Sequence, residues 1–210
     1  MSAAAVPIDD ILTSAPVLPV VVIEDPAKAV PLARALVAGG IRAIEITLRT
    51  PKALEAVRAI AAEVPGAIPG VGTVLTAADL DAAAAAGARF AVSPGATQAL
   101  FDAAWAQALP YLPAVATASE LMAALEAGFS TCKFFPAAQA GGPEAIKALG
   151  GPFPQARFCP TGGIDLATAP AYLALGNVLC VGGSWVAPRS AIDADDFAEI
   201  ERLARQAAAL

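Results

Sequence analysis

The chain has 210 residues, of which 57% are hydrophobic, and its 13 basic and 19 acidic residues give a net charge of -6. This apolar content can supply a sizeable buried core and excludes a disordered chain. The acidic balance, without a run of Lys or Arg, excludes nucleic acid and anionic membrane as expected partners, and no apolar run reaches the roughly 18 residues that span a bilayer.

The start of the chain and its cysteines bear on where the protein works. The opening segment has no basic region and carries Asp9 and Asp10 where a signal peptide is hydrophobic. Cys132, Cys159 and Cys180 lie in apolar runs and lack the spacing of a metal site or a disulfide framework. We therefore expect a cytoplasmic protein with buried thiols.

The sequence contains no histidine, the residue that most often serves as general base and as metal ligand. We expect neither a metal nor a cofactor. Acid-base chemistry must then use Glu, Asp, Lys, Tyr or Cys.

Short apolar runs alternate with Ala-rich amphipathic segments along the chain, after a leading helix at 8–14. Eight runs are apolar on both faces, as expected of buried parallel strands. They cover residues 17–23, 43–48, 68–74, 90–93, 112–117, 131–135, 156–160 and 178–182. The clearest helices are expected at 26–38, 51–63, 77–86 and 118–127. Glycines at 39–40, 87, 128 and 176 fit left-handed helix C-caps.

Eight strands that alternate with helices use up the chain, so we expect one domain over residues 1–210. Such strands can close into a barrel or stay open as a doubly wound sheet, and the hydrophobic pattern does not separate the two. The polar exceptions fall repeatedly at the carboxyl ends of strands, where barrel enzymes carry their functional residues. We therefore predict an α/β fold of the (β/α)8 TIM-barrel type with a short N-terminal helix.

A carboxylate and a guanidinium share one face of the second expected strand. Alternation groups Glu45, Thr47 and Arg49, with Ile44 and Ile46 on the other face. Glu45 is the only acidic residue placed inside a strand, and a carboxylate in an apolar barrel can exchange protons near neutrality. Arg49 ends the strand, where its donor fork can hold a carboxylate. The alternatives are a structural ion pair for Glu45 and a surface position for Arg49.

Lys133 differs from the other lysines, which lie in expected helices with polar neighbours (Lys28, Lys52, Lys147). It lies near the end of the sixth strand, where alternation groups it with Thr131 and Phe135 against Cys132 and Phe134. Burial disfavours the charged ammonium and leaves more free amine, which attacks a carbonyl carbon to form a Schiff base. The alternative is a lysine that pairs with a carboxylate or turns outward, although buried lysines are rare without a purpose.

Paired glycines adjoin the ends of the last two expected strands, in the segments Thr161-Gly162-Gly163 and Gly182-Gly183-Ser184. Glycine lets backbone N–H groups approach an anion, and the loops after strands seven and eight of barrels often hold phosphate. One such pair is usually only a turn, but two on adjacent strands favour a ligand with a terminal phosphate. The ligand would then place a carboxylate near Arg49 and a carbonyl within reach of Lys133.

The chain carries six short motifs at or near the ends of its expected strands. They are Glu45-Ile46-Thr47-Leu48-Arg49-Thr50, Gly72-Thr73-Val74, Ser93-Pro94-Gly95, Lys133-Phe134-Phe135-Pro136, Pro160-Thr161-Gly162-Gly163 and Gly182-Gly183-Ser184-Trp185. In this order, over residues 19–188, they resemble the 2-keto-3-deoxy-6-phosphogluconate aldolase family. Close relatives of that family act on 4-hydroxy-2-oxoglutarate and on 2-keto-3-deoxy-6-phosphogalactonate. The resemblance implies a metal-free lysine Schiff-base aldolase, usually a homotrimer, that cleaves 2-keto-3-deoxy-6-phosphogluconate to pyruvate and glyceraldehyde 3-phosphate in the Entner-Doudoroff pathway.

The resemblance also implies a role for each matching residue. Lys133 would form the imine with the C2 ketone. Glu45, through a water, would take the C4 hydroxyl proton and later protonate C3. Arg49 and Thr73 would hold the pyruvate carboxylate. The remaining matches would form an apolar wall around the imine (Pro94, Phe135) and bind the distal hydroxyls and phosphate (Thr161, Gly162, Gly163, Ser184).

Two positions depart from the family pattern: Ala138, where glutamate is frequent, and Ala114, where glycine is common. Neither is expected to touch the imine or the base, so they bear on substrate detail. The preference among the three substrates stays open. Two other interpretations are a barrel enzyme that binds phosphate without forming an imine, and a silent sugar-phosphate binding module. The presence of both Lys133 and Glu45 argues against the silent module.

Overall fold

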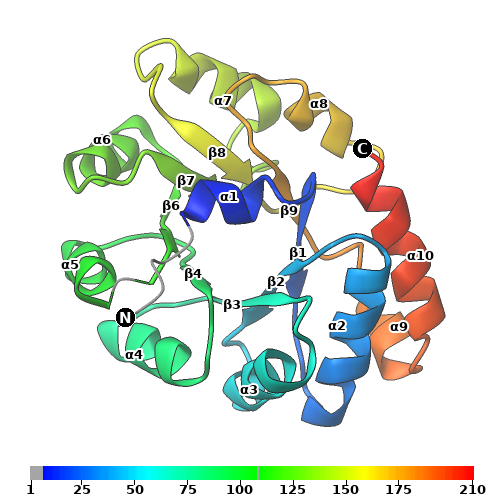
Figure 1. The fold of residues 1–210 in the computed structure, drawn as a ribbon. Helices are drawn as coiled ribbons and strands as arrows, with labels where there is room; N and C mark the ends of the chain where they lie inside the picture. The colour runs from blue at the N-terminus through cyan, green and yellow to red at the C-terminus, as the bar shows by residue number, and fades with distance from the viewer. Residues whose placement is uncertain (1–6, 108) are drawn as a thin grey trace.

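The computed structural model describes residues 7–107 and 109–210. It is an α/β fold in which parallel strands curl around a common centre and helices surround them (Figure 1). One sheet has six strands in the order β5-β4-β3-β2-β1-β9, and the other has three in the order β6-β7-β8. The strands are β1 Val17–Val21, β2 Ala43–Thr47, β3 Ile68–Gly72, β4 Phe90–Val92, β5 Tyr111–Leu112, β6 Ala114–Val115, β7 Thr131–Phe134, β8 Arg157–Pro160 and β9 Val181–Gly183.

Apart from α1, which precedes the first strand, the helices follow the strands in chain order and form the outer ring of Figure 1. They are α1 Ile8–Leu12, the 3-10 helix η1 Pro26–Lys28, α2 Ala29–Ala38, α3 Ala53–Glu63, α4 Ala77–Ala85, α5 Gln98–Gln107, α6 Ala118–Glu126, α7 Gly142–Gly150, α8 Ala169–Leu173, α9 Arg189–Asp193 and α10 Phe197–Ala208. Within the described ranges, no helix is both long enough and apolar enough to cross a membrane.

The fifth expected strand, 112–117, is divided into β5 and β6 by Pro113. Proline has no N–H to donate, so it interrupts a ladder of hydrogen bonds. β5 pairs with β4, whereas β6 pairs with β7, and the Pro113 carbonyl accepts a hydrogen bond from the Lys133 N–H at 2.8 Å. This short segment therefore links the two sheets through the chain itself.

The last expected strand, 178–182, is also shorter than predicted. β9 begins at Val181, and Val178 makes only an isolated parallel bridge to Phe158. A second isolated bridge joins Thr161 to Gly182. These two bridges place β8 beside β9 and connect the two sheets on their other side.

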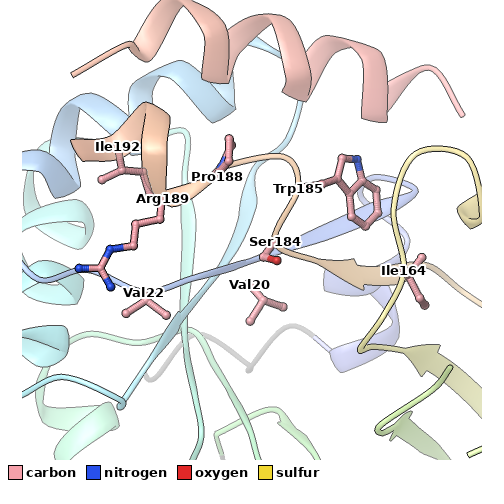
Figure 2. A pocket seen from close by; sticks show the side chains of 9 residues that line it. Val20, Val22, Ile164, Ser184, Trp185, Pro188, Arg189 and Ile192 are labelled. Carbon is pink, nitrogen blue, oxygen red and sulfur yellow. The ribbon is translucent and has the colours of Figure 1, made fainter. Parts of the chain in front are cut away.

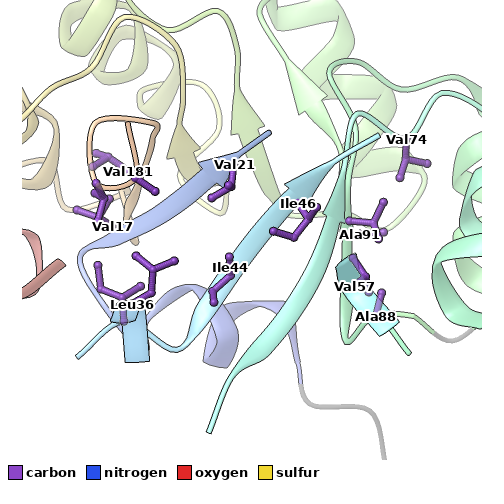
Figure 3. Packing of buried hydrophobic residues seen from close by; sticks show 14 of the residues in the cluster. Val17, Val21, Leu36, Ile44, Ile46, Val57, Val74, Ala88, Ala91 and Val181 are labelled. Atoms are coloured by element: carbon purple, nitrogen blue, oxygen red, sulfur yellow. The ribbon is translucent and has the colours of Figure 1, made fainter. Parts of the chain in front are cut away.

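The strands bury apolar side chains on both faces, which explains why their sequences do not alternate with polar residues. The outer layer lies between strands and helices, where Ile44, Ile46 and Val57 pack together (Figure 3). The inner layer lies inside the curled sheets and includes Leu18 and Phe90 of the strands. Its remaining members are Ile11, Leu12, Ala43, Val92, Leu112, Cys159 and Cys180.

Helix α1 covers one end of the inner layer. Its Ile11 and Leu12 are buried and pack in the cluster of residues that begin the strands, such as Ala43 and Phe90. In Figure 1, α1 accordingly crosses the middle of the ring. The amino-terminal end of the strands is thus closed, and the carboxyl-terminal end is left for the loops.

Helix ends largely follow the predicted signals. Gly40, Gly87 and Gly128 have positive φ angles of 96°, 85° and 89°, as expected of left-handed C-caps. The prediction for Gly176 is wrong, because α8 already ends at Leu173 and Gly176 is not among the glycines with positive φ. The helix expected at 26–38 begins as η1 and becomes α-helical only from Ala29.

Candidate active site

Lys133 and Glu45 meet inside the curled sheets. Lys133 lies on β7 and Glu45 on β2, and these strands belong to different sheets. The Lys133 Nζ is 3.3 Å from Glu45 Oε1, and the two side chains are only 7% and 1% exposed. The alternation predicted for β7 is confirmed, because Cys132 and Phe134 pack in the outer layer instead. The amine and the carboxylate therefore form a buried pair that reaches across the interior.

The Glu45 carboxylate is held against the backbone of β3. A Cβ atom at Gly72 would overlap Glu45 Oε1, so only glycine leaves room for the carboxylate in this position. Its second oxygen, Oε2, is buried and has no hydrogen-bond partner among the described residues. One oxygen of Glu45 thus faces the lysine, and the other is available to accept a proton.

Two titratable groups of the outer layer, Cys132 and Tyr111, are chemically quiet. Burial raises the pKa of the Cys132 thiol to about 12, so this neighbour of Lys133 stays protonated and is a poor nucleophile. Burial also raises the pKa of Tyr111 to about 12, and its hydroxyl is 2.5 Å from the Ser93 hydroxyl. The Phe135 ring lies 5.3 Å from the Lys133 Nζ and adds an apolar side to its surroundings.

A pocket of about 310 Å³ opens at the carboxyl ends of the strands. It brings together eight of the residues predicted from sequence: Arg49, Phe135, Thr161, Gly162, Gly163, Gly182, Gly183 and Ser184. Val20 and Val22 of the first strand and its loop also line it, and nothing in their apolar sequence marks them as site residues. A positive group and the glycine segments therefore share one opening.

Four predicted residues lie outside the set that lines this pocket: the buried pair of Lys133 and Glu45, and Thr73 and Pro94. Thr73 directly follows β3 and is half-buried with a φ of 61°, a backbone conformation that is uncommon for threonine. Pro94 is also half-buried and comes two residues after the end of β4. Both nevertheless lie at carboxyl ends of strands, the same end as the pocket.

The glycine segments have conformations that side chains would block. Gly162 and Gly163 have φ angles of 103° and 72°. A Cβ at Gly182 would overlap the Thr161 hydroxyl, and one at Gly183 would overlap the Trp185 ring. The absence of a side chain thus leaves room for Thr161 and Trp185 beside β9, and it permits the positive φ angles of the loop after β8.

A second pocket of about 400 Å³ continues from the first (Figure 2). The two share Val20, Val22, Ile164 and Ser184, and the second extends to Arg189 at the start of α9. Sequence reasoning missed Arg189, because an arginine at the start of a short helix gives no signal of its own. Among residues 7–107 and 109–210, no three His, Cys, Asp or Glu side chains cluster closely enough to hold a metal ion.

Comparisons with known proteins agree with this geometry. A family model described as KDPG and KHG aldolase matches residues 8–203. The KHG/KDPG aldolase of Escherichia coli strain K12 is 52% identical over 199 residues, which cover 95% of this chain and 93% of that protein. The crystal structure of 2-keto-3-deoxy-6-phosphogluconate aldolase from Zymomonas mobilis ATCC 29191 superposes with a TM-score of 0.93 at 51% identity, covering 97% of each chain.

A second similar structure holds a covalent reaction intermediate of its own protein. It is KDPG aldolase from Legionella pneumophila, with pyruvate captured at low pH as a covalent carbinolamine intermediate. It is 46% identical to this chain, has a TM-score of 0.93, and the match covers 95% of this chain and 97% of that one.

Proposed function

The chain belongs to the KDPG and KHG aldolase family, and from this premise we propose that it cleaves 2-keto-3-deoxy-6-phosphogluconate (KDPG) to pyruvate and glyceraldehyde 3-phosphate. The observation that carries the proposal is the buried pair of Lys133 and Glu45, 3.3 Å apart. An amine kept out of water next to a carboxylate provides both the nucleophile and the proton acceptor that a Schiff-base aldolase needs.

The reaction begins at the amine. Lys133 attacks the C2 ketone of the substrate, and loss of water from the carbinolamine gives a protonated imine. Glu45 accepts the proton of the C4 hydroxyl, the C3–C4 bond breaks, and its electron pair moves toward the imine nitrogen to give an enamine. Glyceraldehyde 3-phosphate leaves, Glu45 returns the proton to C3, and hydrolysis of the imine releases pyruvate and the free amine.

The residues of the first pocket would hold the two ends of the substrate. Arg49 carries a positive charge to the opening and suits the carboxylate of the keto acid, with the Thr73 hydroxyl as a second donor. Phe135 and Pro94 would form the apolar wall at the imine. The distal hydroxyls and phosphate would lie along Thr161, the two glycine loops and Ser184.

Borohydride reduction in the presence of pyruvate tests the chemistry. The proposal predicts a stable adduct located on Lys133 by peptide mass spectrometry, and Lys133→Ala should lose both the adduct and cleavage. Glu45→Gln should still trap pyruvate but turn over about 10²- to 10⁴-fold more slowly, the usual loss for a general acid-base group. Lys147→Ala, which removes a lysine of α7, is the matched control. Unmodified Lys133 after reduction would leave the non-imine, phosphate-binding enzyme as the better interpretation.

The substrate preference within the family is a separate question. KDPG is our first choice, because the glycine loops and the second pocket suit a phosphorylated end. The alternatives are 4-hydroxy-2-oxoglutarate and 2-keto-3-deoxy-6-phosphogalactonate. Steady-state kinetics on all three should give the highest kcat/KM for KDPG, and a higher value for either other compound would reassign the substrate.

We also propose that the two sheets form one closed (β/α)8 barrel and that residues 1–210 form a single domain. Two features support closure: Pro113 joins β5 to β6 within one segment, and parallel bridges connect β8 to residues 178 and 182. The pair of Lys133 and Glu45 also supports it, since side chains from both sheets meet in the middle.

The assembly and location follow as two further parts of the proposal. We propose a homotrimer, supported by large apolar side chains that are more than half exposed at Leu75, Trp105 and Met122 around α4 to α6. Light scattering should give about three times the monomer mass, and a monomeric mass would contradict the trimer.

We place the enzyme in the cytoplasm, where its free thiols would stay reduced.

A further inference from the structure

Arg189 lines the part of the second pocket that the first pocket does not share. Its side chain extends from the start of α9 toward Val22, and Ser184 lies next to Val20 on the same pocket (Figure 2). The first pocket runs from Arg49 and Phe135 to Ser184, and the second continues from Ser184 to Arg189. Arg49 and Arg189 thus lie in the two unshared parts of one continuous opening.

The charges of this opening match a ligand with two anionic ends. Of the described residues that line the two pockets, only Arg49 and Arg189 are cationic. Arg49 is proposed to bind the carboxylate beside the imine, so it cannot also serve the far end. The glycine loops offer neutral N–H groups to a phosphate, and Arg189 is the one side chain there that can offset its charge.

We propose that Arg189 binds the distal phosphate of the substrate and thereby sets the preference for phosphorylated over unphosphorylated substrates. This inference rests on the proposed aldolase function and extends it to a specificity-determining residue. An unphosphorylated substrate such as 4-hydroxy-2-oxoglutarate is shorter, and its second carboxylate would stay within the first pocket. Arg189 would therefore contribute less to its binding.

Glu24 competes with the phosphate for Arg189. The Arg189 Nη2 is 2.8 Å from Glu24 Oε1, and its Nε donates to Asp193 Oδ2 at 3.4 Å. Arg189 and Glu24 are 70% and 59% exposed, and exposed ion pairs of this kind are weak. A phosphate dianion can displace Glu24, because the guanidinium fork binds both groups and the phosphate carries the larger negative charge. Removal of Glu24 should therefore strengthen phosphate binding, whereas removal of Arg189 should weaken it.

The test compares KDPG with 4-hydroxy-2-oxoglutarate as substrates. Arg189→Ala should raise KM for KDPG about tenfold, the size expected for a charge-assisted hydrogen bond that solvent partly screens. The loss should fall mainly on KM, because the imine forms at a distance, and KM for 4-hydroxy-2-oxoglutarate should change much less. Inorganic phosphate should inhibit the Arg189→Ala variant more weakly, and Arg189→Lys should restore part of the affinity.

Glu24→Gln should change KM for KDPG in the opposite direction from Arg189→Ala. It should lower KM for KDPG in the wild-type background and have no effect when combined with Arg189→Ala. Arg205→Ala is the matched control, because Arg205 is 65% exposed and pairs with Glu201 on α10, which contributes no residue to either pocket. It removes the same charge and should leave the ratio of the two KM values unchanged.

The outcomes separate this inference from the function on which it rests. If wild-type protein forms the pyruvate adduct and cleaves both substrates, but Arg189→Ala changes the two KM values equally, the role of Arg189 is wrong and the aldolase function stands. The same holds if Arg205→Ala mimics Arg189→Ala. If wild-type protein neither traps pyruvate nor cleaves either substrate, the proposed function itself fails.

Discussion

The position of the Glu45 carboxylate depends on the absence of a side chain at Gly72. A Cβ atom at Gly72 would overlap Glu45 Oε1, so Gly72→Ala should push the carboxylate away from the amine without removing either group. We expect kcat to fall by about tenfold or more, since misplaced acid-base groups lose part of a 10²- to 10⁴-fold contribution. The readout is deuterium exchange into the pyruvate methyl group, for which Glu45 is the proposed base, measured beside borohydride trapping, for which the proposal requires only Lys133.

Gly176→Ala is the control for this experiment, because no atom lies within 4 Å of a Cβ built at Gly176. It should leave exchange, trapping and thermal stability unchanged. A Gly72→Ala variant that exchanges the methyl protons at the wild-type rate would show that Glu45 does not depend on this glycine.

Among single residues, sequence alone could find those whose charge conflicts with their apolar neighbours. Lys133 and Glu45 are charged side chains in apolar strands, and the structure brings them to 3.3 Å. Gly72 and Arg189 give no such signal. Gly72 matters because the Glu45 side chain of β2 packs against the backbone of β3. Arg189 matters because of where the segment after β9 places it. The residues next to Gly72 and Arg189 in the sequence predict neither position.

The N-terminus of α6 carries a pH-dependent cap. The Thr117 hydroxyl accepts from the Glu120 N–H, and Glu120 Oε2 accepts from the N–H groups of Ala116 and Thr117 at 2.8 Å each. These hydrogen bonds, that from Ala116 first, lower the pKa of Glu120 below its ordinary value of 4.5. A carboxyl whose pKa is lower in the folded state contributes its stability above pH 4.5 and loses it as the pH falls through the folded pKa.

Glu120→Gln should therefore destabilise the protein near neutrality by roughly 0.5–1 kcal/mol, the usual size of a cap. The difference from wild type should shrink as the pH falls below 4.5. Urea unfolding at several pH values measures it. Glu126→Gln is the control, because it removes an equal charge in the last turn of the same helix, away from the cap. A stability difference between wild type and Glu120→Gln that did not change with pH would contradict this account.

The ends of helices and strands could be predicted where a signal lies in the neighbouring residues. They were harder to predict where the pairing of strands sets the boundary. Threonine before a helix and a carboxylate three residues later fix the starts of α4 and α6. The division of one expected strand at Pro113 follows from its missing N–H, which could have been read from sequence. The late start of β9 could not, because its extent depends on which residues of β1 and β8 lie opposite.

For the whole molecule, the sequence predicts strands that are apolar on both faces but not how they curve. Alternation of strands and helices is compatible with an open sheet as well as a barrel. The choice of a barrel rested on polar residues at strand ends, and three of them, Arg49, Thr161 and Ser184, do line one pocket. Which side chains share the interior, such as Phe90, Cys159 and Cys180 in one cluster, depends on the tilt of every strand together.

Helix α1 should stabilise the molecule without taking part in its chemistry. Leu12 is 2% exposed and packs in the inner layer near the residues that begin the strands, whereas the pocket opens at the opposite ends. Leu12→Ala should lower the free energy of unfolding by about 2–4 kcal/mol, because it leaves a cavity, with kcat and KM for KDPG unchanged. Leu210→Ala, at a leucine that is 42% exposed, should cost less than about 0.5 kcal/mol. A Leu12→Ala protein that keeps wild-type stability would mean that α1 only covers the inner layer, and one that loses activity while folded would mean that the two ends of the strands are coupled.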